Sequence, residues 1–189
     1  MRLFVAVTPP PESLADLQAA VAAARADHPD LRWSGPEDWH VTLAFLGQVP
    51  APVTARLAPR LERAAARHRP FPLALAGAGA FPATGNARVL WCGLDGDRRA
   101  LAALAASVAA AATEAGAPPP DAGRPFRPHL TLARTRTPAD VRDLVTTLGA
   151  YAGPRWRADR VELIESRPNG PPRYRLAGHW PLNGDTLSS

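Results

Sequence analysis

The stretch Trp39-His40-Val41-Thr42-Leu43-Ala44-Phe45 has a second copy in this chain, Pro128-His129-Leu130-Thr131-Leu132-Ala133-Arg134. Both copies contain the pattern His-x-Thr-Leu-Ala. In an extended strand, successive side chains point to opposite faces, so each His shares a face with its Thr and with the residue two positions beyond that Thr. We therefore predict two strands, each with one face that can form a site and one apolar face that packs in the core.

A single His on a strand is more often structural than functional, but chance rarely produces two copies of a five-residue pattern in a chain of 189 residues. The repeat therefore indicates an internal duplication with a period of about ninety residues. It predicts two similar lobes that bring the two His-x-Thr strands to a shared cleft.

The length fits one domain or two small lobes, and 46% apolar residues suffice for an ordinary core. The lone Cys92 cannot form an internal disulfide and lies in an apolar run, so we expect a small core residue and a cytoplasmic protein. The apolar run at residues 3–7 is too short for a signal peptide, and no stretch is long enough to cross a membrane. We expect no membrane association.

The net charge of +5 suits an anionic partner such as nucleic acid. All 22 basic residues are Arg, however, and the chain is also rich in Ala and Pro, so an overall compositional bias explains the charge equally well. A binding role must therefore be argued for each arginine separately.

Hydrophobic periodicity and turn residues predict an alternation of strands and helices. We expect strands over 3–7, 39–46, 71–76, 88–94, 128–134, 161–166 and 173–182, a short extended piece at 31–33, and helices over 10–28, 53–64, 97–115 and 138–149. Pro138 is expected to open the last helix, and the proline-rich segment 118–128 to form an extended, mobile surface loop. This order predicts an α+β fold of two lobes, each a mixed or antiparallel sheet with helices on its outer face.

The residue types around the two motifs favour general acid–base chemistry. The sequence offers no obvious third ligand for zinc, so we expect no metal and no cofactor. Ser34, Ser166 and Cys92 lack the surroundings of a nucleophile. Two imidazoles can instead divide the work of an in-line displacement at phosphorus, one accepting a proton from water and the other protonating the leaving oxygen. The Thr hydroxyls can donate hydrogen bonds to the non-bridging oxygens.

On these motifs the chain resembles the 2H phosphoesterases, specifically the RNA 2′,3′-cyclic phosphodiesterase family, also called 2′-5′ RNA ligases. The resemblance extends beyond the motifs to residues 2–7, Arg32-Trp33, residues 88–94, Glu165-Ser166, Tyr174 and residues 180–182. It implies one domain over residues 1–189, made of two intertwined lobes around a pseudo-two-fold cleft.

The resemblance also implies the roles of individual residues. His40 would donate a proton to the leaving oxygen and His129 would activate water, while Thr42, Thr131 and Arg134 would bind the phosphate. It implies RNA ends or nucleotides with a 2′,3′-cyclic phosphate as substrates, a 2′-phosphate product, and possible reverse ligation. We expect a monomer.

Alternatives remain open for the function and for several residues. A phosphodiesterase of another small cyclic phosphate shares the mechanism, and a module that binds RNA ends without catalysis would use the same Thr and Arg groups. Phe45 is expected in the core, because an ideal strand points it away from the His and Thr face. Arg124 and Arg127 are expected to meet RNA phosphates or to remain solvated. The other histidines, at positions 28, 68 and 179, are expected to be exposed or structural.

Overall fold

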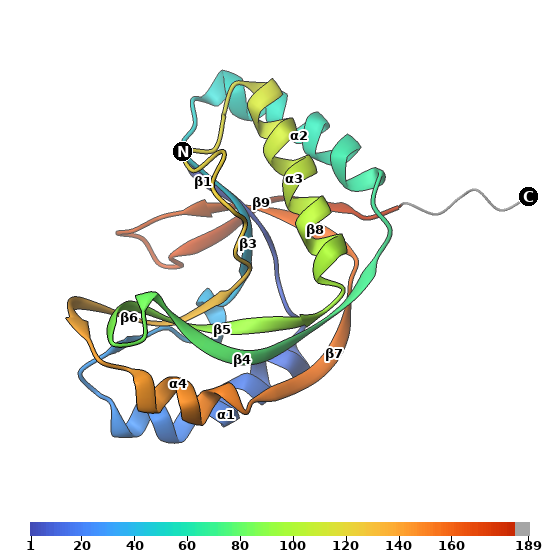
Figure 1. Ribbon diagram of the computed structural model, residues 1–189. Helices are drawn as coiled ribbons and strands as arrows, with labels where there is room; N and C mark the ends of the chain where they lie inside the picture. The colour runs from blue at the N-terminus through green and yellow to red at the C-terminus, as the bar shows by residue number, and fades with distance from the viewer. Residues whose placement is uncertain (184–189) are drawn as a thin grey trace, which may run out of the picture.

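A computed structural model describes residues 1–183 of the chain and shows nine strands and four helices over that range. Figure 1 shows them in two layered halves. The elements, in chain order, are β1 (Arg2–Val7), α1 (Pro11–Asp27), β2 (Arg32–Trp33), the 3-10 helix η1 (Pro36–Asp38), β3 (Val41–Gln48), α2 (Ala51–Ala66), β4 (Phe71–Ala83), β5 (Asn86–Gly96), α3 (Arg98–Ala115), β6 (Leu130–Ala139), α4 (Arg142–Gly149), β7 (Ala152–Ala158), β8 (Arg160–Ser166) and β9 (Tyr174–Pro181).

The strands form two antiparallel sheets, so the predicted α+β fold is confirmed. The first sheet has the order β3-β1-β8-β9, and the second has the order β2-β6-β5-β4-β7. In both sheets the motif strand, β3 or β6, pairs with the strand that precedes a long helix, β1 or β5. The two halves therefore share one strand arrangement, as the repeated motif predicted.

Two helices cross from the sheet that precedes them in the chain to the other sheet. Helix α1 follows β1 but packs against β7 and β4 of the second sheet, whereas α3 follows β5 but packs against β3 of the first. Helices α2 and α4 stay with their own sheets, against β9 and β4. Figure 1 shows the result, with α2 and α3 together on one outer side and α1 and α4 on the other. Each half thus contains segments from both parts of the sequence.

Local sequence signals set the ends of the longer helices. Pro10 and Pro11 begin α1, where a missing N–H costs no helical hydrogen bond. The Asp97 carboxylate caps α3 by accepting a hydrogen bond from the Ala100 N–H, and Gly116 ends it at φ +97°, a left-handed conformation that favours glycine. No helix within residues 1–183 combines the length and the apolarity needed to span a bilayer.

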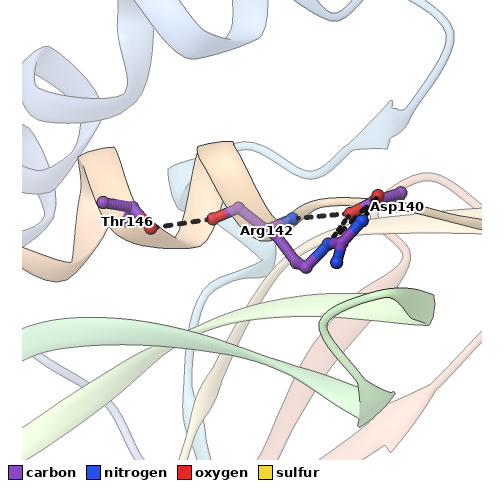
Figure 2. A network of polar contacts seen from close by, with 3 residues as sticks. All are labelled: Asp140, Arg142 and Thr146. Carbon is purple, nitrogen blue, oxygen red and sulfur yellow. Dashed lines mark hydrogen bonds and ion pairs between the residues drawn. The ribbon is translucent and has the colours of Figure 1, made fainter.

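The start of the last helix differs from the prediction. Pro138 lies within β6, not at the start of α4. In this part of β6, residues 135–138 lie between the paired positions Arg134 and Ala139, so no ladder hydrogen bond requires the missing proline N–H. The helix begins instead at Arg142, with Val141 as its N-cap. The Asp140 carboxylate, just before it, accepts hydrogen bonds from the Arg142 backbone N–H and guanidinium, as Figure 2 shows.

Strand β7 was not predicted from the sequence. It contains Pro154 and is mostly exposed. It forms the edge of the second sheet, where only β4 pairs with it. An edge strand tolerates proline because one row of its backbone groups faces solvent.

Candidate active site

Each motif strand carries a β-bulge at its central Leu. In β3, Thr42 pairs with Ala6 and Ala44 pairs with Val5, so Leu43 is the additional residue. In β6, Thr131 pairs with Trp91 and Ala133 pairs with Leu90, so Leu132 is the additional residue. A bulge of this kind shifts the alternation of side chains by one position. The two copies of the motif therefore share a local distortion as well as a sequence.

The bulge corrects one expectation about which residues share the site face. Ala44 and Ala133, two positions beyond the threonines, are buried in the main core, and only Ala133 also lines the wall of the cleft. Phe45 and Arg134 lie on the site face instead. Phe45 pairs with Phe4, and Thr42 pairs with Ala6. Because Phe4 and Ala6 share one face of β1, Phe45 and Thr42 also share a face. The expectation that Phe45 points away from His40 and Thr42 is thus wrong, although Phe45 does pack against a small apolar cluster.

The two motif strands contribute to one cleft of about 640 Å³. All five residues predicted for the site line it. The lining residues are Arg32, Trp33, Ser34, Asp38, His40, Thr42, Phe45, Asp121, His129, Thr131, Ala133, Arg134, Pro168, Arg173 and Tyr174. The cleft is therefore built from both sheets, with one imidazole and one Thr hydroxyl from each.

His40 lies between two aromatic rings. The centroid of its ring is 4.6 Å from that of Phe4 and 5.0 Å from that of Tyr174, which meets it edge-on. Burial, with smaller contributions from the positive charges of Arg173 and His129, lowers the pKa of His40 to about 4. In the free protein at neutral pH, His40 is therefore uncharged.

His129 has a similar aromatic setting but a defined hydrogen bond. Its ring meets Phe81 edge-on at 4.9 Å, and its Nδ1–H donates to the Arg127 carbonyl oxygen at 2.7 Å. Burial lowers the pKa of His129; the Arg127 carbonyl opposes this shift, and the charge of Arg134 adds to it. With Nδ1 protonated, the neutral ring keeps a lone pair on Nε2, which can accept a proton.

Ser34 connects the two motifs. Its hydroxyl lies within hydrogen-bond distance of the Thr131 and Leu132 carbonyl oxygens, at 3.0 and 3.1 Å, and its backbone N–H donates to the Leu132 carbonyl oxygen at 2.9 Å. The same hydroxyl accepts a hydrogen bond of 3.1 Å from Nε1 of Trp39, the residue before His40. This short path fixes the start of one motif against the backbone of the other.

The charged groups of the cleft are mostly cationic. Arg32, Arg134 and Arg173 all line it. Two carboxylates, of Asp38 and Asp121, line it as well. Burial raises the pKa of the Asp38 carboxyl, Arg173 opposes that shift, and Glu37 adds to it. The surplus of guanidinium groups, together with two Thr hydroxyls, is suited to a phosphate or another oxyanion.

Several lining residues have no role that the sequence predicts. Arg32, Trp33 and Tyr174 belong only to the family resemblance, and Ser34 is not a predicted nucleophile or ligand. Asp38 ends the 3-10 helix η1, and Asp121 and Arg173 lie in loops; all three are outside the two motifs. One sequence feature points to residues 32–38, namely their position immediately before the first motif. If this segment contacts the second motif, its residues must lie at the cleft.

Other expected residues lie outside the cleft or contribute differently. The side chains of Arg124 and Arg127 do not line it, although the Arg127 carbonyl orients His129. His28 and His179 are exposed, and His68 makes a hydrogen bond of 2.7 Å with Ser107, as expected of structural histidines. Cys92 is 1% exposed and burial raises its pKa to about 12, so it is a core residue and not a nucleophile. Within residues 1–183, no three His, Cys, Asp or Glu side chains form a group that could hold a metal ion.

Residues 9–170 match the sequence profile of the 2′-5′ RNA ligase superfamily. Curated relatives named RNA 2′,3′-cyclic phosphodiesterase include two that align with nearly the whole chain. The protein from Thermus thermophilus is 34% identical over 98% of this chain and 92% of its own length. The protein from Geobacillus stearothermophilus is 31% identical over 96% of this chain, but this chain spans only 57% of its length.

Solved structures agree in fold. A crystal structure of a Thermus thermophilus protein superposes with a TM-score of 0.76, at 28% identity over 98% of this chain and all of the other. A crystal structure of Escherichia coli LigT in complex with 3′-AMP superposes with a TM-score of 0.70, at 29% identity over 96% of this chain and 97% of the other. Both similarities extend over both halves of the molecule.

Proposed function

The chain belongs to the 2′-5′ RNA ligase superfamily, and from that premise we propose that it hydrolyses 2′,3′-cyclic phosphodiesters of RNA ends or nucleotides to 2′-phosphomonoesters. The observation that carries the proposal is the cleft itself. Two imidazoles, each followed by a Thr on its own bulged strand, line one cavity together with three arginines. A site that only bound phosphate would need the Thr and Arg groups alone, whereas paired imidazoles serve proton transfer.

His129 is the proposed base. Its Nδ1–H is already donated to the Arg127 carbonyl, so Nε2 is the nitrogen that takes a proton from the attacking water. As the water oxygen bonds to phosphorus, the bond from phosphorus to the ribose 3′-oxygen breaks on the opposite side. His40 gives its proton to that oxygen. The ribose ends with a 2′-phosphate and a free 3′-hydroxyl.

Substrate binding would prepare His40 for this role. The pKa of about 4 leaves His40 neutral at pH 7 in the free protein, because burial disfavours its cation. A bound cyclic phosphate brings one negative charge next to both imidazoles and raises the pKa of each. Thr42, Thr131 and Arg134 then contribute hydrogen bonds and charge to the non-bridging oxygens as the transition state forms.

The same proposal includes the setting of the enzyme. We propose that residues 1–189 form one domain of two intertwined lobes, supported by the two helices that pack on the opposite sheet. We also propose a cytoplasmic monomer that needs no metal or cofactor. Its substrates are RNA ends or nucleotides, as the names of the Thermus thermophilus relative and of the LigT complex suggest. The reverse reaction would join a 2′,3′-cyclic phosphate to a 5′-hydroxyl through a 2′-5′ bond.

The test is hydrolysis of adenosine 2′,3′-cyclic phosphate by purified protein in EDTA, with the product identified by phosphorus NMR. We expect a 2′-phosphate, and we expect His40→Ala and His129→Ala each to lower kcat by about 10²-fold or more while the fold is retained. His28→Ala, which removes an exposed imidazole outside the cleft, is the matched control. A 3′-phosphate as the main product would reverse the two histidine roles. Binding without turnover would instead favour an RNA-end binding module.

A further inference from the structure

Two arginines face each other directly across the edge of the second sheet. Arg32 on β2 pairs with Arg134 on β6, and β2 is the edge strand. Residues directly opposite in an antiparallel pair point to the same face, with Cβ atoms about 5 Å apart. Both side chains are exposed, and both line the cleft. Like charges directly opposite each other destabilise a strand pair. The two arginines therefore do not stabilise the pairing of β2 with β6, and a binding role can account for them.

Neither guanidinium has a protein partner among the described residues. Within residues 1–183, neither Arg32 nor Arg134 donates a hydrogen bond from its side chain or forms an ion pair. Other arginines of the chain do have acidic partners, for example Arg175 with Glu165 at 2.7 Å and Arg160 with Glu162 at 2.8 Å. The opposed pair is thus left free to bind an anion bidentately from two sides.

Both arginines lie beyond Thr131 along the sheet. Thr131 pairs with Trp91, and Arg134 pairs with Val89, two positions away on β5. Thr131 and Arg134 are therefore about 7 Å apart along the strand direction. The other motif strand, β3, is itself the edge of its sheet, so no further strand lies beside Phe45 to supply an opposed arginine. Arg173 also lines the cleft, on the side of His40. The directly opposed arginine pair is therefore a feature of the β6 side, and this difference between the two sides gives a bound chain a direction.

Resting on the proposed function, we propose that Arg32 binds a second phosphate of the substrate, the one attached to the 5′-oxygen of the terminal ribose, with Arg134 beside it contributing charge to both phosphates. An RNA end with a 2′,3′-cyclic phosphate carries its next negative charge at that oxygen, one ribose away from the reacting phosphorus. Arg32 would then select for RNA ends and 5′-phosphorylated nucleotides over nucleosides that carry only the cyclic phosphate.

Three substrates separate the second phosphate from the rest of the RNA chain. They are adenosine 2′,3′-cyclic phosphate, its 5′-monophosphate, and the dinucleotide ApA with a 2′,3′-cyclic end. We expect kcat/KM to be higher for the second and third than for the first. Arg32→Gln should lower kcat/KM by about tenfold on those two substrates and leave the first unchanged, as expected for one charge-assisted phosphate contact. The salt dependence of KM for the dinucleotide should weaken in the same variant.

The controls address charge and folding. Arg63→Gln removes an equal charge from the exposed surface of α2 and should change none of the three rates. The Tm of Arg32→Gln should equal or exceed that of the parent protein, because the substitution removes a repulsion. An equal loss on all three substrates, or no loss on any, would overturn the assignment of Arg32. If the parent protein hydrolyses none of the three, the proposed function itself fails.

Discussion

Replacing Ser34 by Ala should destabilise the protein through a single buried hydrogen-bond donor. Trp39 is 3% exposed, and the Ser34 hydroxyl is the acceptor that its Nε1–H finds within residues 1–183. Without that hydroxyl, the indole N–H remains buried and unpaired, which costs about 1–3 kcal/mol. The Ser34 contact to the Thr131 carbonyl is lost as well, adding up to about 1 kcal/mol. We expect a loss of about 2 kcal/mol in the free energy of unfolding, and a Tm lower by about 4–8 °C.

A double-mutant cycle tests that reasoning by urea denaturation. Trp39→Phe removes the donor and keeps most of the ring, so no unpaired N–H remains when Ser34→Ala is added. The serine substitution should therefore cost at least about 1 kcal/mol less in the Trp39→Phe background than in the parent protein. If the two changes are additive, or if Ser34→Ala alone costs less than about 0.5 kcal/mol, the hydroxyl does not hold the two motifs together.

Three further predictions concern charge and protonation. The pKa of His40 is about 4 in the folded protein, below its ordinary value of 6.5, so the unfolded chain binds the proton first as the pH falls. The free energy of unfolding should therefore drop by about 3 kcal/mol between pH 7 and pH 4. Urea titrations should show a smaller drop for His40→Gln. Because the pKa values of both histidines are lowered, the pH profile of kcat/KM should be bell-shaped with its maximum below pH 6.5, and EDTA should not change it. The pH profile of kcat should lie at higher pH, because bound phosphate raises both pKa values. A rate that rises steadily through neutral pH would contradict the role of His40 as the acid. Thr42→Ala and Thr131→Ala should each lower kcat by about tenfold, less than the histidine substitutions, and an unchanged steady-state rate in either would remove that hydroxyl from the site.

The sequence alone determined the elements whose signals are local. Helical spacing of apolar residues, Pro at the start of α1 and Gly116 at the end of α3 depend on neighbours within a few positions, so they could be predicted without knowing the fold. The repeated His-x-Thr pattern likewise predicted two equivalent strands. It also predicted a shared cleft between His40 and His129, because a duplicated unit tends to place its copies in equivalent positions.

Only the tertiary structure decided which neighbours complete the site. Strand register depends on the sum of contacts between strands far apart in the chain, and the bulges at Leu43 and Leu132 shift that register by one residue. This shift moves Phe45 and Arg134 to the cleft face, which strict alternation did not predict. The pairing of Arg32 with Arg134 has the same origin, since no local pattern shows which residue lies opposite on another strand. The Ser34 hydroxyl depends on that pairing too, because β2 must lie beside β6 before the serine can reach the Thr131 carbonyl.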